Sequence, residues 1–88
     1  MTTTTTVEVT VRFYAAARAA AGNEVETIRI QPGTTLAELV DQLSDRDAKL
    51  AKVLMRCSFL CDGVAVRDTD VALGNAQTID VLPPFAGG

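Results

Sequence analysis

The residues of this chain best suited to chemistry lie at its end, in the segment Pro83-Pro84-Phe85-Ala86-Gly87-Gly88. Gly87 and Gly88 carry no Cβ atom, and Ala86 carries only a methyl group, so the walls of a channel could close tightly around this backbone. An α-carboxylate on such a stem can reach the active site of another protein. We therefore expect residues 83–88 to form a flexible, extended tail whose Gly88 carboxylate is the reactive group.

Two prolines separate this tail from an apolar strand predicted at residues 78–82. Proline fixes φ at about −65° and has no N–H to donate to a sheet, so Pro83 and Pro84 should end the strand and keep the next residues extended. Leu82 and Phe85 flank the prolines and belong to the predicted partner-binding segment. Phe85 could anchor the tail in a partner or pack back onto its own sheet, and the sequence leaves both open.

Composition limits the class of protein. At 88 residues, 48% of them hydrophobic, the chain has room for one small domain. A net charge of −3 with only 8 Lys and Arg residues argues against nucleic acid as a partner, because phosphate binding needs clustered cations. No apolar run approaches the ~20 residues of a membrane span, and residues 1–6 lack the features of a signal peptide. We expect a disordered lead at residues 1–6, a domain at 7–82 and a cytoplasmic location.

The sequence contains few side chains of the kinds that commonly act in catalysis or bind metal ions. There is no histidine, and only two cysteines occur, Cys57 and Cys61, whereas a zinc or iron–sulfur site normally needs about four ligands. We therefore predict no metal site and treat both cysteines as small buried hydrophobes. A Gly-rich loop that could cradle the phosphates of ATP is also absent from the sequence. Four acidic residues are interpreted as solvated loop charges: Asp45, Asp47, Asp68 and Asp70.

The first half of the chain predicts a hairpin and a helix. Apolar and polar residues alternate from Val7 to Phe13, which indicates a strand with one buried face, and a second strand is expected at residues 24–30. An alanine-rich stretch that stops at Gly22 should give one or two helical turns between them. The main helix starts at a capping box and presents an apolar side at helical spacing. The residues involved are Thr35, Leu36, Glu38, Leu39, Val40 and Leu43.

The second half predicts a further short helix, to about Arg56, and then strands. Asp62-Gly63 is a strong signal for a tight turn between two of them. The last strand should lie centrally beside the first. Leu82, Phe59 and Leu60 are candidates for a partner-binding patch near the tail, although alternation does not tell which face they occupy, and for Phe59 we expect a core position instead. This order of elements predicts an α+β domain with a mixed sheet packed on one main helix, and a β-grasp roll fits it.

Three stretches resemble the MoaD/ThiS sulfur carriers, which are ubiquitin-like β-grasp proteins. The stretches are an aromatic–Ala–Arg–Gly pattern from Phe13 through Arg18 to Gly22, the turn and capped helix from Pro32 to Leu39, and the ending Leu82–Gly88. A diglycine end by itself is shared by other ubiquitin-like proteins. The double proline at this spacing is most similar to the ending of the small subunit of molybdopterin synthase.

The resemblance implies a non-catalytic carrier subunit of a sulfurtransferase complex. A partner adenylyltransferase of the ubiquitin-activating type would use ATP to adenylate Gly88, and a sulfur donor of the rhodanese or cysteine desulfurase type would convert it to a thiocarboxylate. The tail would then enter the large subunit of molybdopterin synthase, in a heterotetramer, and donate sulfur to cyclic pyranopterin monophosphate in molybdenum cofactor biosynthesis. No cofactor would be tightly bound. Arg18 would meet an acidic partner surface or remain solvated.

Other functions would use the same sequence features. A sulfur carrier for thiamine or cysteine biosynthesis would differ only in its partners. A ubiquitin-like protein modifier would use the adenylated tail to form an amide with lysines of target proteins. A plain interaction module would make no chemical use of the tail.

Overall fold

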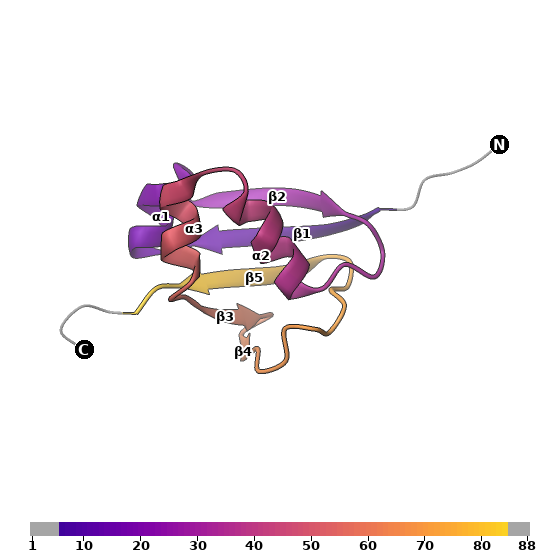
Figure 1. Cartoon of the computed structure of the whole chain (residues 1–88). Coiled ribbons are helices and arrows are strands. Elements are labelled where there is room, and N and C mark those ends of the chain that lie inside the picture. Colours follow the sequence, from indigo (N-terminus) through magenta and orange to yellow (C-terminus); the bar gives the residue numbers. More distant parts are fainter. Residues whose placement is uncertain (1–5, 85–88) are drawn as a thin grey trace.

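A mixed five-stranded sheet and three helices make up the part of the chain that the computed structural model describes, residues 6–84 (Figure 1). In chain order the elements are β1 (Val7–Phe13), α1 (Ala15–Ala21), β2 (Val25–Ile30), α2 (Leu36–Ser44), α3 (Ala48–Leu54), β3 (Ser58–Cys61), β4 (Val64–Ala65) and β5 (Gln77–Leu82). The disorder predicted at the start of the chain, up to residue 5, and the roles predicted for four tail residues lie outside the described residues. Those tail residues are Phe85, Ala86, Gly87 and Gly88.

The last strand runs through the middle of the sheet, as predicted. The strand order is β2-β1-β5-β3-β4, with β5 parallel to β1 and antiparallel to β3. The hairpin of β1 and β2 is antiparallel and also matches the prediction. Because β1 and β5 run the same way, β5 ends at the edge of the sheet where α1 begins. In Figure 1 this edge lies opposite the start of β1.

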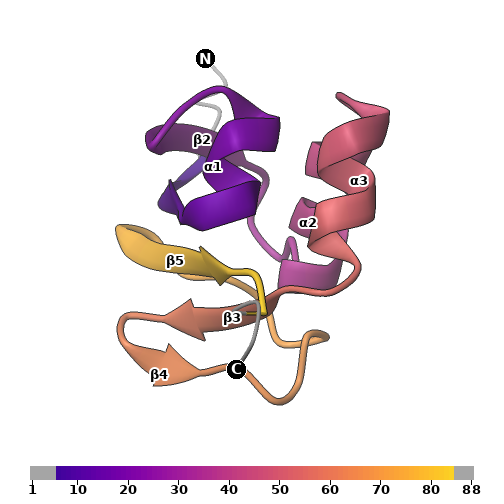
Figure 2. The same cartoon turned by 90° about the vertical axis from the view of Figure 1, so that its left-hand side faces the viewer.

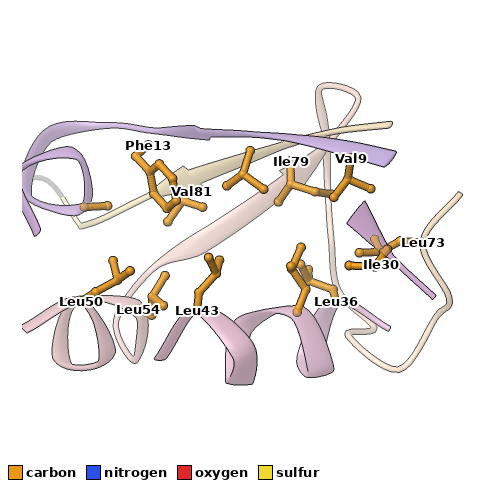
Figure 3. Close-up of a cluster of buried hydrophobic side chains, with 13 residues drawn as sticks. Val9, Phe13, Ile30, Leu36, Leu43, Leu50, Leu54, Leu73, Ile79 and Val81 are labelled. Atoms are coloured by element: carbon orange, nitrogen blue, oxygen red, sulfur yellow. The ribbon is translucent and has the colours of Figure 1, made fainter. Parts of the chain in front are cut away.

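The core forms between one face of the sheet and the helices. Figure 3 shows side chains of β1 and β5 on one side facing leucines of α2 and α3 on the other. Val11, Ile79 and Val81 are fully buried, because alternate residues of a strand point to the same face. The sequence predicted one main helix against the sheet, but α2 and α3 both contribute to the core. Leu50 and Leu54 of α3 are as buried as the leucines of α2.

Local signals in the sequence set several boundaries correctly. The capping box at the start of α2 is complete, with Thr35 Oγ1 accepting from the Glu38 N–H and the Glu38 carboxylate accepting from the Thr35 N–H. Asp62 and Gly63 both have positive φ, as the tight turn predicted between β3 and β4 requires. The Asp62 carboxylate also accepts from the Thr78 N–H at 2.8 Å, which ties this turn to β5.

Two of the acidic residues predicted to be solvated are exposed as expected, and they also bond to nearby backbone. Asp47 is the N-cap of α3 and accepts from the Lys49 N–H at 2.7 Å. Asp68 likewise accepts from the Asp70 N–H at 2.9 Å and shapes its own loop. Short carboxylate side chains commonly make such bonds to nearby backbone, which loop composition alone does not reveal.

Candidate functional site

The candidate site is the end of β5, from which the chain continues toward the diglycine. Val81 and Leu82 are the last strand residues, and the Val81 carbonyl accepts from the Tyr14 N–H at 3.3 Å. Pro83 and Pro84 then leave the sheet, as their missing N–H groups predict. Pro83 is buried in the domain and Pro84 is exposed, so the chain becomes accessible at Pro84.

A shallow groove lies at the point where the chain becomes accessible. It has a volume of about 220 Å³ and is formed by α1, α3 and the two prolines. Figure 2 shows the end of β5 close to α3 in this part of the molecule. We call it the tail-root groove and define it by six residues: Ala16, Lys52, Val53, Arg56, Pro83 and Pro84. Its floor is mostly apolar, while Lys52 and Arg56 supply two cations.

The face of the sheet turned away from the helices carries a different set of groups beside the same exit. The Asp80 carboxylate accepts from Arg12 Nε at 2.6 Å and from Arg12 Nη2 at 2.9 Å, a bidentate pair between β5 and β1. Asp80 is 5% exposed, although none of the helices in residues 6–84 covers this face. The hydrogen bonds to Asp80 raise the pKa of Arg12 above its ordinary value.

The strand register shows which face of the sheet Phe59, Leu60 and Leu82 occupy. Phe59 pairs with Val81 and so lies on the helix-covered face, in agreement with its predicted core position. Leu60 pairs with Asp80, and Leu82 is two residues further along β5, so both lie on the uncovered face. Leu60 and Leu82 are half-buried there, next to the Arg12–Asp80 pair. Together these four residues form what we call the outer patch.

Arg18 does not join either set. It is exposed on α1 and lines a separate polar hollow with Ala15, Ala19, Gly22, Asn23 and Glu24. Ala16, two positions earlier on the helix, lines the tail-root groove. Residues two apart on a helix point in different directions, so the structure places Arg18 away from the exit of the tail.

The cysteines are half-buried and pack against the core. Cys57 Sγ donates to the Val53 carbonyl at 3.2 Å, and burial raises the pKa of its thiol. Burial, with a smaller contribution from Asp62, also raises the pKa of Cys61. Because the thiolate is the reactive form, both thiols are poor nucleophiles at neutral pH. Residues 6–84 hold no group of three or more His, Cys, Asp or Glu side chains placed to bind a metal ion.

Lys52, Arg56 and Arg12 are site residues that sequence reasoning missed. Lys52 and Arg56 are four residues apart at the end of a predicted helix, a spacing that puts both on one face. That spacing was a usable signal, but nothing in the sequence places this face beside Pro84. Arg12 and Asp80 are 68 residues apart, and only the parallel pairing of β1 with β5 brings them together.

Comparison with known proteins now identifies the family. The sequence matches the ThiS family over residues 11–88, which includes the end of β1, all of β5, the tail-root groove and the diglycine. The chain belongs to the ThiS family. No curated protein matches it. Within the described part of this ThiS-family chain, no helix is long and apolar enough to cross a membrane.

Solved structures of similar proteins share the fold. A putative molybdopterin-converting factor subunit 1 from Pyrococcus furiosus is 23% identical, with a TM-score of 0.81 over 90% of this chain and 99% of that one. The small archaeal modifier protein 1 from Methanosarcina acetivorans is 22% identical, with a TM-score of 0.77 over 96% and 99%. A complex of subunits 1 and 2 of the molybdopterin-converting factor from Helicobacter pylori 26695 contains a chain that is 23% identical, with a TM-score of 0.69 over 93% and 100%. The fold is therefore the β-grasp of ThiS/MoaD sulfur carriers and ubiquitin-like modifiers.

Proposed function

We propose that this ThiS-family chain is the sulfur-carrier subunit of a molybdopterin synthase. Gly88 is adenylated by an ATP-using partner of the ubiquitin-activating type, with release of pyrophosphate. The persulfide sulfur of a rhodanese or cysteine desulfurase type of donor then displaces AMP, and a thiol reductant cleaves the S–S bond of the resulting acyl disulfide. The resulting thiocarboxylate enters the large subunit, within a heterotetramer in the cytoplasm. It transfers sulfur to cyclic pyranopterin monophosphate and returns to the carboxylate.

The family match carries this proposal, because it extends through Gly88. The likeness in fold to subunit 1 of two molybdopterin-converting factors, one of them solved together with subunit 2, supports a large-subunit partner. The double proline before Phe85 favours this branch of the family over the carriers of thiamine or cysteine biosynthesis.

The chain's own contribution is to position an accessible carboxyl group. An α-carboxylate has a pKa of about 3.5, so it is ionised at neutral pH and resists nucleophilic attack until a partner activates it. The buried Pro83 holds the base of the tail on the domain, and the small residues after Phe85 admit the backbone to a narrow channel. The outer patch lies next to this exit and gives a partner a mixed apolar and charged surface to recognise.

Intact-mass measurement tests the first half of the proposal. The chain is incubated with ATP, a ubiquitin-activating-type adenylyltransferase and a sulfur donor. We expect a product heavier by the difference between one sulfur and one oxygen atom, located on the C-terminal peptide. A chain lacking Gly88 should gain no mass, while a Gly74→Ala variant, altered outside the tail, should be loaded normally. Sulfur on Cys57 or Cys61 instead of Gly88 would contradict the proposal.

Reconstitution tests the second half. The thiocarboxylated chain is mixed with a molybdopterin synthase large subunit and cyclic pyranopterin monophosphate, and dithiolene formation is followed. We expect product in proportion to the carrier supplied, with two carriers consumed for each product because two sulfurs are needed. A confirmed thiocarboxylate that yields no dithiolene would point to another sulfur pathway.

A ubiquitin-like modifier is the second candidate, and the likeness in fold to the small archaeal modifier protein 1 favours it. A modifier would use the same adenylated Gly88 but form an amide with a lysine of a target protein. Conjugates that survive a denaturing gel, and that disappear when Gly88 is deleted, would support this function. A free thiocarboxylated chain without conjugates supports the carrier.

A further inference from the structure

We propose that the tail-root groove binds the protein's own tail, with Phe85 on its apolar floor and the Gly88 carboxylate between Lys52 and Arg56. This inference rests on the proposed function for the carboxylate at Gly88, and it adds a resting position for the tail between rounds of transfer. The tail leaves this position when a partner takes it.

The composition of the groove fits a segment with one aromatic residue and one anion. Ala16, Val53 and the prolines provide an apolar surface, and Val53 is half-buried, with part of its side chain left accessible. The segment Phe85–Gly88 has one large apolar side chain and, at its end, one negative charge. Covering this apolar surface with an aromatic ring removes both from water, which is favourable.

The two cations of the groove have no acidic partner within residues 6–84. The ion pairs there involve Arg12, Arg29 and Arg46. Lys52 lies in the last turn of α3 and Arg56 in the turn that follows the helix, and both line the groove, so an anion bound there would lie near both cations. The chain has a net charge of −3, so acidic residues outnumber basic ones, and yet these two neighbouring cations lack an acidic partner within residues 6–84.

The remaining chain begins at the groove itself. Pro84 forms one wall of the groove, so the four residues that follow start at the site. At roughly 3.3 Å per residue they reach at most about 13 Å from Pro84, so the whole segment stays within a short distance of the groove. A tail held there in most molecules would lower the apparent affinity of a partner in proportion to the fraction held. Docking of the tail in the groove would therefore set the apparent affinity of the partners for the tail.

Methyl NMR of the full-length chain tests the position of Phe85. An aromatic ring changes the resonance frequencies of methyl groups that it contacts, and leucine in its place does not. We expect Phe85→Leu to move the methyl resonances of Ala16 and Val53 and to leave those of Val64, on the far strand β4, unchanged. If Ala16 and Val53 do not respond, the proposal is overturned.

A charge-matched pair of variants tests the carboxylate contact. Lys52→Gln with Arg56→Gln should release the tail and move the Ala16 and Val53 resonances to the positions seen in Phe85→Leu. Lys49→Gln with Arg67→Gln changes the net charge equally but outside the groove, and should leave them in place. Added salt should act like the groove variant, because the contact is exposed to screening. If the groove variant keeps the wild-type resonances, the carboxylate contact is excluded.

These measurements are independent of sulfur loading. The mass gain of the thiocarboxylate is recorded for the same chains with the activating partner and donor. Normal loading without any response at Ala16 and Val53 would reject the groove contact and retain the proposed function. A response at these methyl groups in a chain that is never loaded would support the groove contact and reject the proposed function.

Discussion

The two faces of the central strands β1 and β5 are built for different purposes. On the helix-covered face, Val9, Phe13 and Ile79 are apolar and almost completely buried. On the other face, the same two strands carry the Arg12–Asp80 pair, whose carboxylate is buried and whose guanidinium is half exposed. The first face stabilises the fold through apolar contact. The second keeps a fixed, charged surface beside the exit of the tail.

This difference predicts that substitutions on the two faces will separate stability from function. Buried apolar groups have no partner but the core, so their loss should appear in the free energy of unfolding. The outer patch has fewer neighbours, and its residues should matter more when a partner is present.

Truncating the covered face should have the largest effect. Ile79→Ala removes a fully buried side chain from the centre of the sheet and should lower the free energy of unfolding by about 2–5 kcal/mol. Leu82→Ala, on the uncovered face of the same strand, should cost less than half as much. Urea denaturation of both variants measures the difference. Equal losses would show that the outer face is packed as tightly as the core.

Breaking the Arg12–Asp80 pair should have an intermediate and asymmetric effect. Arg12→Ala leaves a buried carboxylate without its partner and should lower the free energy of unfolding. Asp80→Ala leaves the guanidinium half exposed to water, so its cost should be smaller. The two variants and their combination form a double-mutant cycle by urea denaturation. A larger cost for Asp80→Ala would mean that Asp80 contributes through other contacts.

Changing the outer patch should affect partners more than stability. Leu60→Ser should alter the free energy of unfolding by roughly 1 kcal/mol or less, because Leu60 is only half-buried. Its affinity for the large subunit proposed above should fall by about tenfold, as for a contact residue within an interface. Calorimetric titration measures the affinity, and Val64→Ser on the exposed strand β4 is the control. An unchanged affinity would place the interface elsewhere.

The smallest effect should come from the thiol of Cys57. Burial raises its pKa, so as pH rises the unfolded chain loses this proton before the folded chain does, and stability falls from the ordinary thiol pKa of about 8.5 upward. Cys57→Ser does not titrate there, so its urea midpoint should decrease less between neutral and alkaline pH. Identical pH profiles would show that Cys57 makes no contribution to the alkaline loss.

Much of the fold could be predicted because its signals are local. The alternation of β1, the capping box at Thr35 and the turn at Asp62 and Gly63 each depend on neighbouring residues, and all three are confirmed. The face of Leu60 could not be predicted, because it depends on the register of β3 against β5. A shift of one residue in that register would have put Leu60 in the core.

The sequence by itself determined the kinds of element, their order and the segment from Leu82 to Gly88, since these follow from hydrophobic period, turn chemistry and the backbone limits of proline and glycine. Only the tertiary structure decided what surrounds the exit of that segment. Placing Arg12 beside Asp80, and Lys52 and Arg56 beside Pro84, requires strands and helices distant in the chain to pack together. Such contacts arise from long-range pairing, which leaves no signature in any short stretch of residues.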